Sequence, residues 1–165
     1  MEGTSLRVLF ASRFTEKKGF RYAFQAFEQA VNAGADPTLT VIGDADGSAR
    51  SQREKERVMS RIEDNDLRDR VNLLGFVDHE TLVQAYYDHH VLLAPSVTAS
   101  DGDVEGGAPV TLIEAQATGL PVVSSFHCDI PEVVLHEKTG LLAQEEDVDA
   151  LASHLQTVLS EPGAR

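Results

Sequence analysis

The chain has 165 residues and a formal net charge of −13, with 42% apolar and 25% charged residues. This length fits one domain, and the apolar share is large enough to form a buried core. The acidity argues against nucleic acid as a partner, because a polyanion repels a protein of the same charge. No apolar run approaches the roughly 20 residues that a membrane-spanning helix needs, so we expect no transmembrane segment.

The N-terminus and the cysteine content indicate the compartment. Met1-Glu2-Gly3-Thr4 lacks the basic start and the long apolar stretch of a signal peptide. Cys128 is the only cysteine, which excludes an internal disulfide and a cysteine-rich zinc site. We therefore expect a cytoplasmic protein.

Short apolar runs alternate with helical patterns along the chain. The expected strands are 6–11, 39–42, 71–74, 91–94, 122–124 and 140–143. The expected helices are 19–33, 50–64, 79–87, 110–118 and 147–159. Strands that are continuously apolar, and that alternate with helices, predict a parallel sheet covered on both faces. The predicted fold is α/β: a Rossmann-like, doubly wound parallel sheet of about six strands with helices on both faces, in a single domain.

The loops that follow the strands should carry the function, because ligands bind beyond the carboxyl ends of an open parallel sheet. The first such loop contains Arg13 and Lys18, expected as exposed cations, and leads into a helix near Gly19. A helix N-terminus attracts anions, so these cations predict a phosphate site, although a solvated basic loop would account for them equally well. Gly43 follows the second strand and permits a tight turn or a close ligand.

The longest irregular segment, 96–108, brings Gly106 and Gly107 to the start of a helix that has Pro109 in its first turn. Bare N–H groups at such a helix start can bind a pyrophosphate. Glu105 and Glu114 flank this start, and carboxylates accept hydrogen bonds from vicinal hydroxyl groups. The segment therefore predicts a ligand that carries both phosphate and hydroxyl groups.

Several segments, in order, resemble the C-terminal domain of the family-four retaining glycosyltransferases, which join two Rossmann-like domains (the GT-B architecture). They are Ser-Arg-Phe-Thr-Glu-Lys-Lys-Gly at 12–19, Val-Ile-Gly-Asp at 41–44, Val-Asn-Leu-Leu-Gly-Phe-Val at 71–77, Ala-Pro-Ser at 94–96, Glu-Gly-Gly-Ala-Pro-Val-Thr-Leu-Ile-Glu-Ala-Gln-Ala-Thr-Gly-Leu-Pro-Val-Val at 105–123, Ile-Pro-Glu-Val-Val at 130–134 and Thr-Gly-Leu-Leu at 139–142. The resemblance covers nearly the whole chain. It implies that residues 1–165 form one nucleotide-sugar-binding domain and that the acceptor-binding N-terminal domain lies outside this chain.

The resemblance also implies roles for individual residues. The catalytic residues would be Glu105, Arg13 and Lys18, and the donor-binding residues Gly43, Gly75, Phe76, Val77, Gly106, Gly107, Val110, Thr111 and Glu114. Arg13 and Lys18 would bind phosphates, the backbone at 75–77 the base, and Glu114 the ribose. Glu105 would face the transferred sugar, and the N–H groups of Val110 and Thr111 would meet the diphosphate.

The implied reaction moves a hexosyl group from a UDP- or GDP-linked sugar to a glycan, lipid or small-molecule acceptor, with retention of configuration. We expect no cofactor and no metal, because Arg13, Lys18 and the helix start can stabilise the leaving diphosphate electrostatically. The full-length protein would act in polysaccharide biosynthesis, which is compatible with peripheral membrane association. The isolated chain should be inactive, since an acceptor site is missing.

Two departures from the family pattern matter. Eight residues separate Glu105 from Glu114, one more than the family motif usually has. Either the glycine pair forms a one-residue bulge, which we favour because glycine tolerates it best, or Gly106 takes the position of the usual glutamate. Cys128-Asp129 stands where the family often has two glycines, which argues against a close backbone approach there.

Alternative interpretations remain open. The chain could be a non-catalytic domain that binds a nucleotide or nucleotide sugar and regulates another activity. A simple dinucleotide-binding fold fits less well, because Gly-x-Gly-x-x-Gly is missing after the first strand. Asp101, Asp103 and Glu105 begin like a calcium loop, but Leu112 occupies the twelfth position instead of glutamate. Asp101-Gly-Asp103 also resembles the metal-binding pair of the other glycosyltransferase architecture, but that architecture would not bring with it the loop of Arg13 and Lys18 or the helix that follows Glu105.

Other reactive or aromatic side chains fit structural roles better than chemical ones. The six histidines show no zinc-ligand spacing. His127 follows a strand and could line the sugar pocket, but we expect a structural role. A lone cysteine is more often a small buried apolar residue than a nucleophile, and this is our expectation for Cys128. Tyr86 and Tyr87 are expected to pack in the core.

Overall fold

The computed structural model describes residues 6–64 and 67–160, so the expectation about residues 1–4 lies outside the described part. Its sheet has the strand order β3-β2-β1-β4-β5-β6, and all five neighbouring pairs are parallel. The strands are β1 (Leu6–Ala11), β2 (Pro37–Ile42), β3 (Val71–Gly75), β4 (Val91–Ala94), β5 (Val122–Ser125) and β6 (Gly140–Ala143). The predicted doubly wound parallel sheet of about six strands is confirmed.

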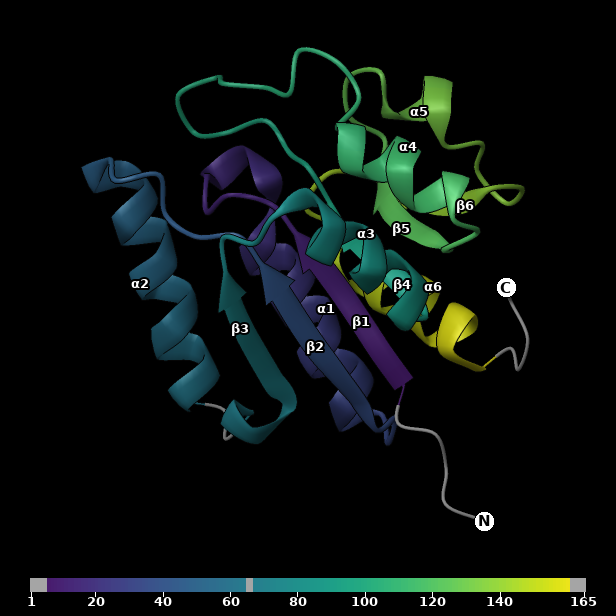
Figure 1. Ribbon diagram of the computed structural model, residues 1–165, viewed down its shortest axis with the longest axis horizontal. Helices are drawn as coiled ribbons and strands as arrows, with labels where there is room; N and C mark the ends of the chain where they lie inside the picture. Colours follow the sequence, from purple (N-terminus) through teal and green to yellow (C-terminus); the bar gives the residue numbers. More distant parts are fainter. Residues whose placement is uncertain (1–5, 65–66, 161–165) are drawn as a thin grey trace.

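Helices cover both faces of the sheet, as Figure 1 shows. One face packs against α1 (Phe20–Asn32), α2 (Ala49–Asp64) and α6 (Val148–Ser160), whose apolar residues share one core cluster. The other face packs against α3 (His79–Asp88), α4 (Val110–Ala117) and the short α5 (Ile130–Val133), which share a second cluster. The central strands are buried on both faces, which explains their continuous apolar runs.

Three short elements were not expected from the sequence. They are α5 and two 3-10 turns, Glu16–Lys18 and Arg68–Arg70. Each is too short to show a helical period, and each fills a connection where an irregular loop was expected. The remaining elements match the expected ones to within a few residues at their ends.

The strand order reverses between β1 and β4, and the loops after these two strands touch each other. A Cβ atom on Gly19 would lie 1.9 Å from the carbonyl oxygen of Pro95, so only glycine permits this approach. The N–H of Val97 donates to the carbonyl of Lys17 over 2.8 Å. This is the topological switch point, where open α/β sheets commonly bind ligands.

Candidate functional site

Predicted site residues from four separate segments line one pocket at the carboxyl end of the sheet. The pocket has a volume of about 220 Å³. Its lining comprises Arg13, Gly43, Phe76, Val77 and Thr111 together with Ala11, Ser12, Ile42 and Leu82. Arg13 is exposed, as expected, and the Phe76 side chain is 63% exposed. The pocket thus combines a cation, an accessible aromatic ring and apolar walls.

Glycine at position 43 lets the loops of the first three strands close around this pocket. A Cβ atom there would lie 1.9 Å from the carbonyl oxygen of Ser12, and the residue has φ of 121°. Its N–H donates to the carbonyl of Gly75 over 2.8 Å. The close approach allowed by Gly43 is therefore one between protein segments, which then frame the pocket.

Lys18 and Glu105, which lie in separate loops of the predicted fold, form an ion pair. The Lys18 Nζ lies 2.7 Å from Glu105 Oε2, and the two side chains are 19% and 6% exposed. Ser96 Oγ donates to the other carboxylate oxygen over 2.7 Å. The expectation that Lys18 is an exposed loop cation is wrong, because the 3-10 turn and this pairing draw it inward.

The acidic residues at 101 and 103 pair with cations of the protein. Arg50 binds the carboxylates of both Asp101 and Glu16, and Lys17 Nζ lies 3.1 Å from Asp103. Hydrogen bonding to Arg50 lowers the pKa of Asp101 to about 2. The segment 96–108, which resembled the start of a calcium loop, is thereby tied to the loop after β1 and to α2.

Glu114 projects from α4 toward α3, where two side chains hold its carboxylate. Tyr86 OH donates to Oε2 over 2.9 Å, and His79 Nε2 lies 3.0 Å from Oε1. Burial, and then the contact with Glu114, raise the pKa of Tyr86 above its usual range. Tyr87 is 53% exposed, so the expectation that it packs in the core is wrong.

The start of α4 exposes backbone donors beside the glycine pair. Val110 and Thr111 are the first two residues of the helix, whose first N–H groups lack acceptors within it. Gly106 has φ of 74°, a left-handed conformation suited to the extra residue of the favoured bulge. Asp129 Oδ2 would lie 3.9 Å from a Cβ atom on Gly107.

Of the residues after β5, Cys128 departs from expectation, whereas His127 fits the structural role expected of it. Cys128 is exposed rather than buried, and its φ of 44° is one that favours glycine. His127 is buried and accepts a hydrogen bond from the Glu105 N–H over 3.2 Å, while its Nδ1 lies 2.5 Å from Glu145 Oε1. No spacing in the sequence pointed to Glu145, which follows β6.

The described residues contain neither a cluster of metal ligands nor a helix that could span a membrane. Among them, no group of three or more His, Cys, Asp or Glu side chains is arranged to hold a metal ion. None of the helices in the described ranges is long and apolar enough to cross a membrane.

Solved structures share this fold. HepE from Anabaena in complex with UDP-glucose superposes with a TM-score of 0.82 at 25% identity, over 95% of this chain and 40% of that one. Sucrose-phosphate synthase from Thermosynechococcus elongatus gives a TM-score of 0.81 at 28% identity, over 99% of this chain and 38% of that one.

Sequence relatives agree with the structural ones. The amylovoran biosynthesis glycosyltransferase AmsK of Erwinia amylovora is 43% identical over 150 residues, which are 91% of this chain and 35% of the relative. The "putative colanic acid biosynthesis glycosyltransferase WcaL" of Escherichia coli K12 is 38% identical over 152 residues. These are 92% of this chain and 36% of the relative. The chain thus spans about a third of the length of these relatives. The family model described as glycosyl transferases group 1 matches residues 5–161, and the chain therefore belongs to this glycosyltransferase family.

Proposed function

We propose that this domain binds the nucleotide-sugar donor of a glycosyltransferase that moves a hexosyl group to a glycan, lipid or small-molecule acceptor. The observation that carries the proposal is that Arg13, Gly43, Phe76, Val77 and Thr111 line one and the same pocket. The Phe76 ring can pack against a nucleotide base, and Arg13 can bind the phosphate that is linked to it. Glu114 on the adjacent helix can accept hydrogen bonds from the ribose hydroxyl groups. UDP- and GDP-linked donors remain the two candidates.

The proposed chemistry is electrostatic. When the bond from the anomeric carbon to the diphosphate breaks, negative charge collects on the leaving phosphate. Arg13, the ammonium group of Lys18 and the free N–H groups at the start of α4 would stabilise that charge without a metal or a cofactor. Retention of configuration stays an implication of the family resemblance, and a cytoplasmic location stays a prediction from the sequence.

Glu105 would act on the sugar side of the donor. Its two carboxylate oxygens accept one bond each from Lys18 and Ser96. A carboxylate has about four lone-pair sites, so each oxygen retains capacity for a sugar hydroxyl group. The ion pair between Lys18 and Glu105 would thus place the charge of Lys18 close to the transferred sugar.

Calorimetry on this chain tests the proposal. We expect weak binding of UDP or GDP, and binding of UDP-glucose or GDP-mannose as representative donors. Failure of a folded protein to bind any of them at millimolar concentration would contradict the proposal. Binding of NAD in preference to all four would instead favour a dinucleotide-binding domain.

Transfer should require more than this chain, because holding two substrates together needs both walls of a closed cleft. We propose that the acceptor site lies on a further domain of the full-length protein. Incubation of the chain with UDP-glucose or GDP-mannose and candidate acceptors should give donor hydrolysis at most. Acceptor-dependent product at about 1 per second or faster would show a complete catalyst. Donor binding with no transfer even by the full-length protein would favour the regulatory alternative.

A further inference from the structure

His127 is a buried histidine whose ring contacts two loops beside the candidate site. The donor binding described above gives it no role. It lies two residues beyond β5 and is 3% exposed. Its Nε2 lies 3.2 Å from the backbone nitrogen of Glu105, and its Nδ1 lies 2.5 Å from Glu145 Oε1. Both ring nitrogens are therefore used, one by the long loop after β4 and one by the loop after β6.

These partners determine where the ring proton sits. A backbone N–H can only donate, so the Nε2 facing Glu105 must present its lone pair. The carboxylate of Glu145 can accept, so Nδ1 carries the hydrogen. The bonds thus assign a neutral imidazole with its proton on Nδ1.

The same contacts fix the loop 96–108 at two places. Glu145 Oε2 accepts a hydrogen bond from the Thr98 N–H over 2.7 Å, near the start of the loop. His127 holds the N–H of Glu105 near its end. Because Glu105 directly precedes the Gly106-Gly107 pair, whose backbone is permissive, an anchor on its N–H restricts how its carboxylate is aimed.

We propose that His127 is a positioning residue: its neutral ring fixes the backbone of Glu105 and so orients the Glu105 carboxylate toward the sugar of the donor. This inference rests on the proposed function. His127 would not touch the donor, and its effect would be exerted through Glu105. It should therefore influence the sugar-bearing donor more than the bare nucleotide.

Three polar groups lie around the His127 ring. They are the Glu145 carboxylate at Nδ1, the Cys128 thiol 3.3 Å from Nε2, and Glu105 itself. A proton added at Nε2 would place two N–H groups against each other and break the bond to Glu105. The hydrogen bond from the Glu105 N–H therefore requires that Nε2 carry no proton.

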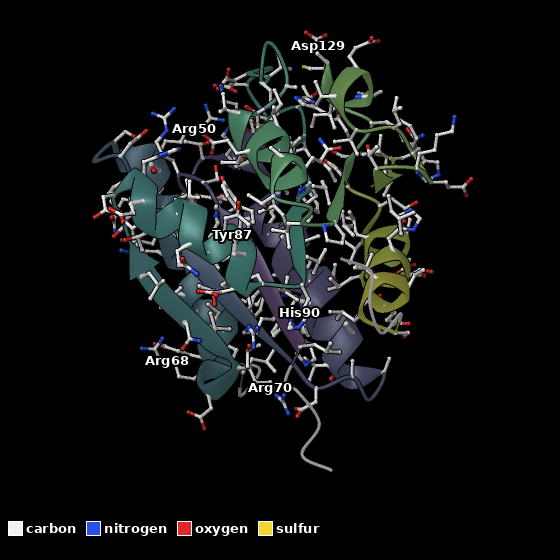
Figure 2. All side chains as sticks on the ribbon, turned by 45° about the vertical axis from the view of Figure 1, so that its right-hand side comes forward. Arg50, Arg68, Arg70, Tyr87, His90 and Asp129 are labelled. Carbon is white, nitrogen blue, oxygen red and sulfur yellow. The ribbon has the colours of Figure 1, made fainter. Side chains whose placement is uncertain are left out.

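Two substitutions separate the anchor from simple packing. His127→Phe keeps a flat ring but removes both nitrogens, whereas His127→Gln keeps a side-chain acceptor. His90→Phe is the matched control, because His90 Nδ1 also accepts a backbone hydrogen bond, from the Arg7 N–H over 3.0 Å. Figure 2 shows His90 at the far end of the sheet from Asp129, which lies two residues after His127.

The binding test compares UDP with UDP-glucose, and GDP with GDP-mannose, by calorimetry. We expect His127→Phe to weaken binding of the nucleotide sugar about tenfold, the effect of leaving one buried N–H unsatisfied, and binding of the bare nucleotide less than about twofold. His127→Gln should restore most of the loss, and His90→Phe should leave both affinities unchanged. Equal losses for both ligands in His127→Phe, or no loss at all, would overturn the inference.

A second test needs no ligand, so it separates a failure of this inference from a failure of the proposed function. In the wild-type chain, long-range ¹H–¹⁵N NMR should show the His127 proton on Nδ1 at neutral pH. Amide exchange at Glu105 should accelerate in His127→Phe and stay near the wild-type rate in His127→Gln. A proton on Nε2, or unchanged exchange at Glu105, would refute the anchor. If instead the anchor is present and no nucleotide binds, the proposed function is what fails.

Discussion

The ammonium group of Lys18 lies 2.7 Å from the carboxylate of Glu105, 87 residues later in the chain, and both side chains are largely withdrawn from solvent. Each charged group is the ion-pair partner of the other, and the Ser96 hydroxyl donates a hydrogen bond to the remaining carboxylate oxygen of Glu105. Neither side chain is therefore free to change without affecting the other. Lys18 is proposed to bind the donor's phosphates and Glu105 its sugar, so this ion pair connects the two parts of the proposed site.

Lys18→Ala should consequently destabilise the protein, whereas Arg13→Ala should not. Removing Lys18 leaves the Glu105 carboxylate without its cation, at a cost of about 1–3 kcal/mol. Arg13 is exposed, and its loss should cost less than about 0.5 kcal/mol. Urea denaturation measures both, and both variants should weaken binding of UDP or GDP. Adding Glu105→Gln to Lys18→Ala should recover part of the stability, and a strictly additive double variant would contradict the coupling.

Glu105→Gln and Glu114→Gln should differ in which ligand they affect. Glu114 is held by Tyr86 and His79 on α3, and we expect its loss to weaken UDP and UDP-glucose equally. Glu105 lies on the other side of the glycine pair, so its variant should weaken the nucleotide sugar more than the bare nucleotide, which it reaches only through Lys18. Calorimetry with the two ligands makes the comparison. Equal losses for both ligands in Glu105→Gln would place Glu105 on the nucleotide and refute the bulge interpretation.

Tyr86→Phe should weaken ribose-dependent binding without greatly changing the core. The substitution keeps the buried ring and removes the hydroxyl that donates to Glu114. A hydrogen bond to a charged group contributes about 1.5–3 kcal/mol, so UDP affinity should fall about tenfold or more. The affinity for inorganic pyrophosphate should stay the same, and Tyr87→Phe on the exposed side of the helix is the control. An equal fall for pyrophosphate would mean that Tyr86 acts on the whole site rather than through Glu114.

Gly43→Ala should disrupt the pocket and the fold together. The added methyl group would lie 1.9 Å from the Ser12 carbonyl oxygen, so the backbone must shift. We expect a loss of about 2 kcal/mol or more in the free energy of unfolding, with lower affinity for UDP. Gly107→Ala is the control for stability, because the nearest atom to its added Cβ is Asp129 Oδ2 at 3.9 Å. Comparable thermal stability of the two variants would contradict the close approach at Gly43.

Arg50→Ala should reduce stability near neutral pH and lose this effect in acid. Hydrogen bonds to Arg50 lower the pKa of Asp101 to about 2, and also lower the pKa of Glu16. A carboxyl group with a depressed pKa in the folded state stabilises it above its unfolded pKa of about 4, and this contribution disappears as the pH falls toward 2. The difference in urea midpoint between wild type and Arg50→Ala should therefore shrink from pH 6 to pH 3. A constant difference would show that Arg50 acts through packing instead.

The sequence by itself determined the fold class and the edge of the sheet where the candidate site lies. Apolar runs such as 6–11 and 91–94, alternating with helical periods, suffice for a parallel sheet because local burial on both faces produces that pattern. The carboxyl ends of parallel strands meet at one edge of the sheet, so the sequence alone indicates that Arg13, Gly43 and Gly75 lie near one another.

Only the tertiary structure decided which side chains pair across that edge. The contacts of Lys18 with Glu105, Tyr86 with Glu114, and His127 with Glu105 and Glu145 join residues from 18 to 87 positions apart. No local period encodes such pairs, because they depend on how far each loop folds back over the strands. The same reason explains why Lys18 and Cys128 were misjudged: the burial of a loop residue is determined by the neighbouring loops, whereas that of a strand residue follows from its own pattern.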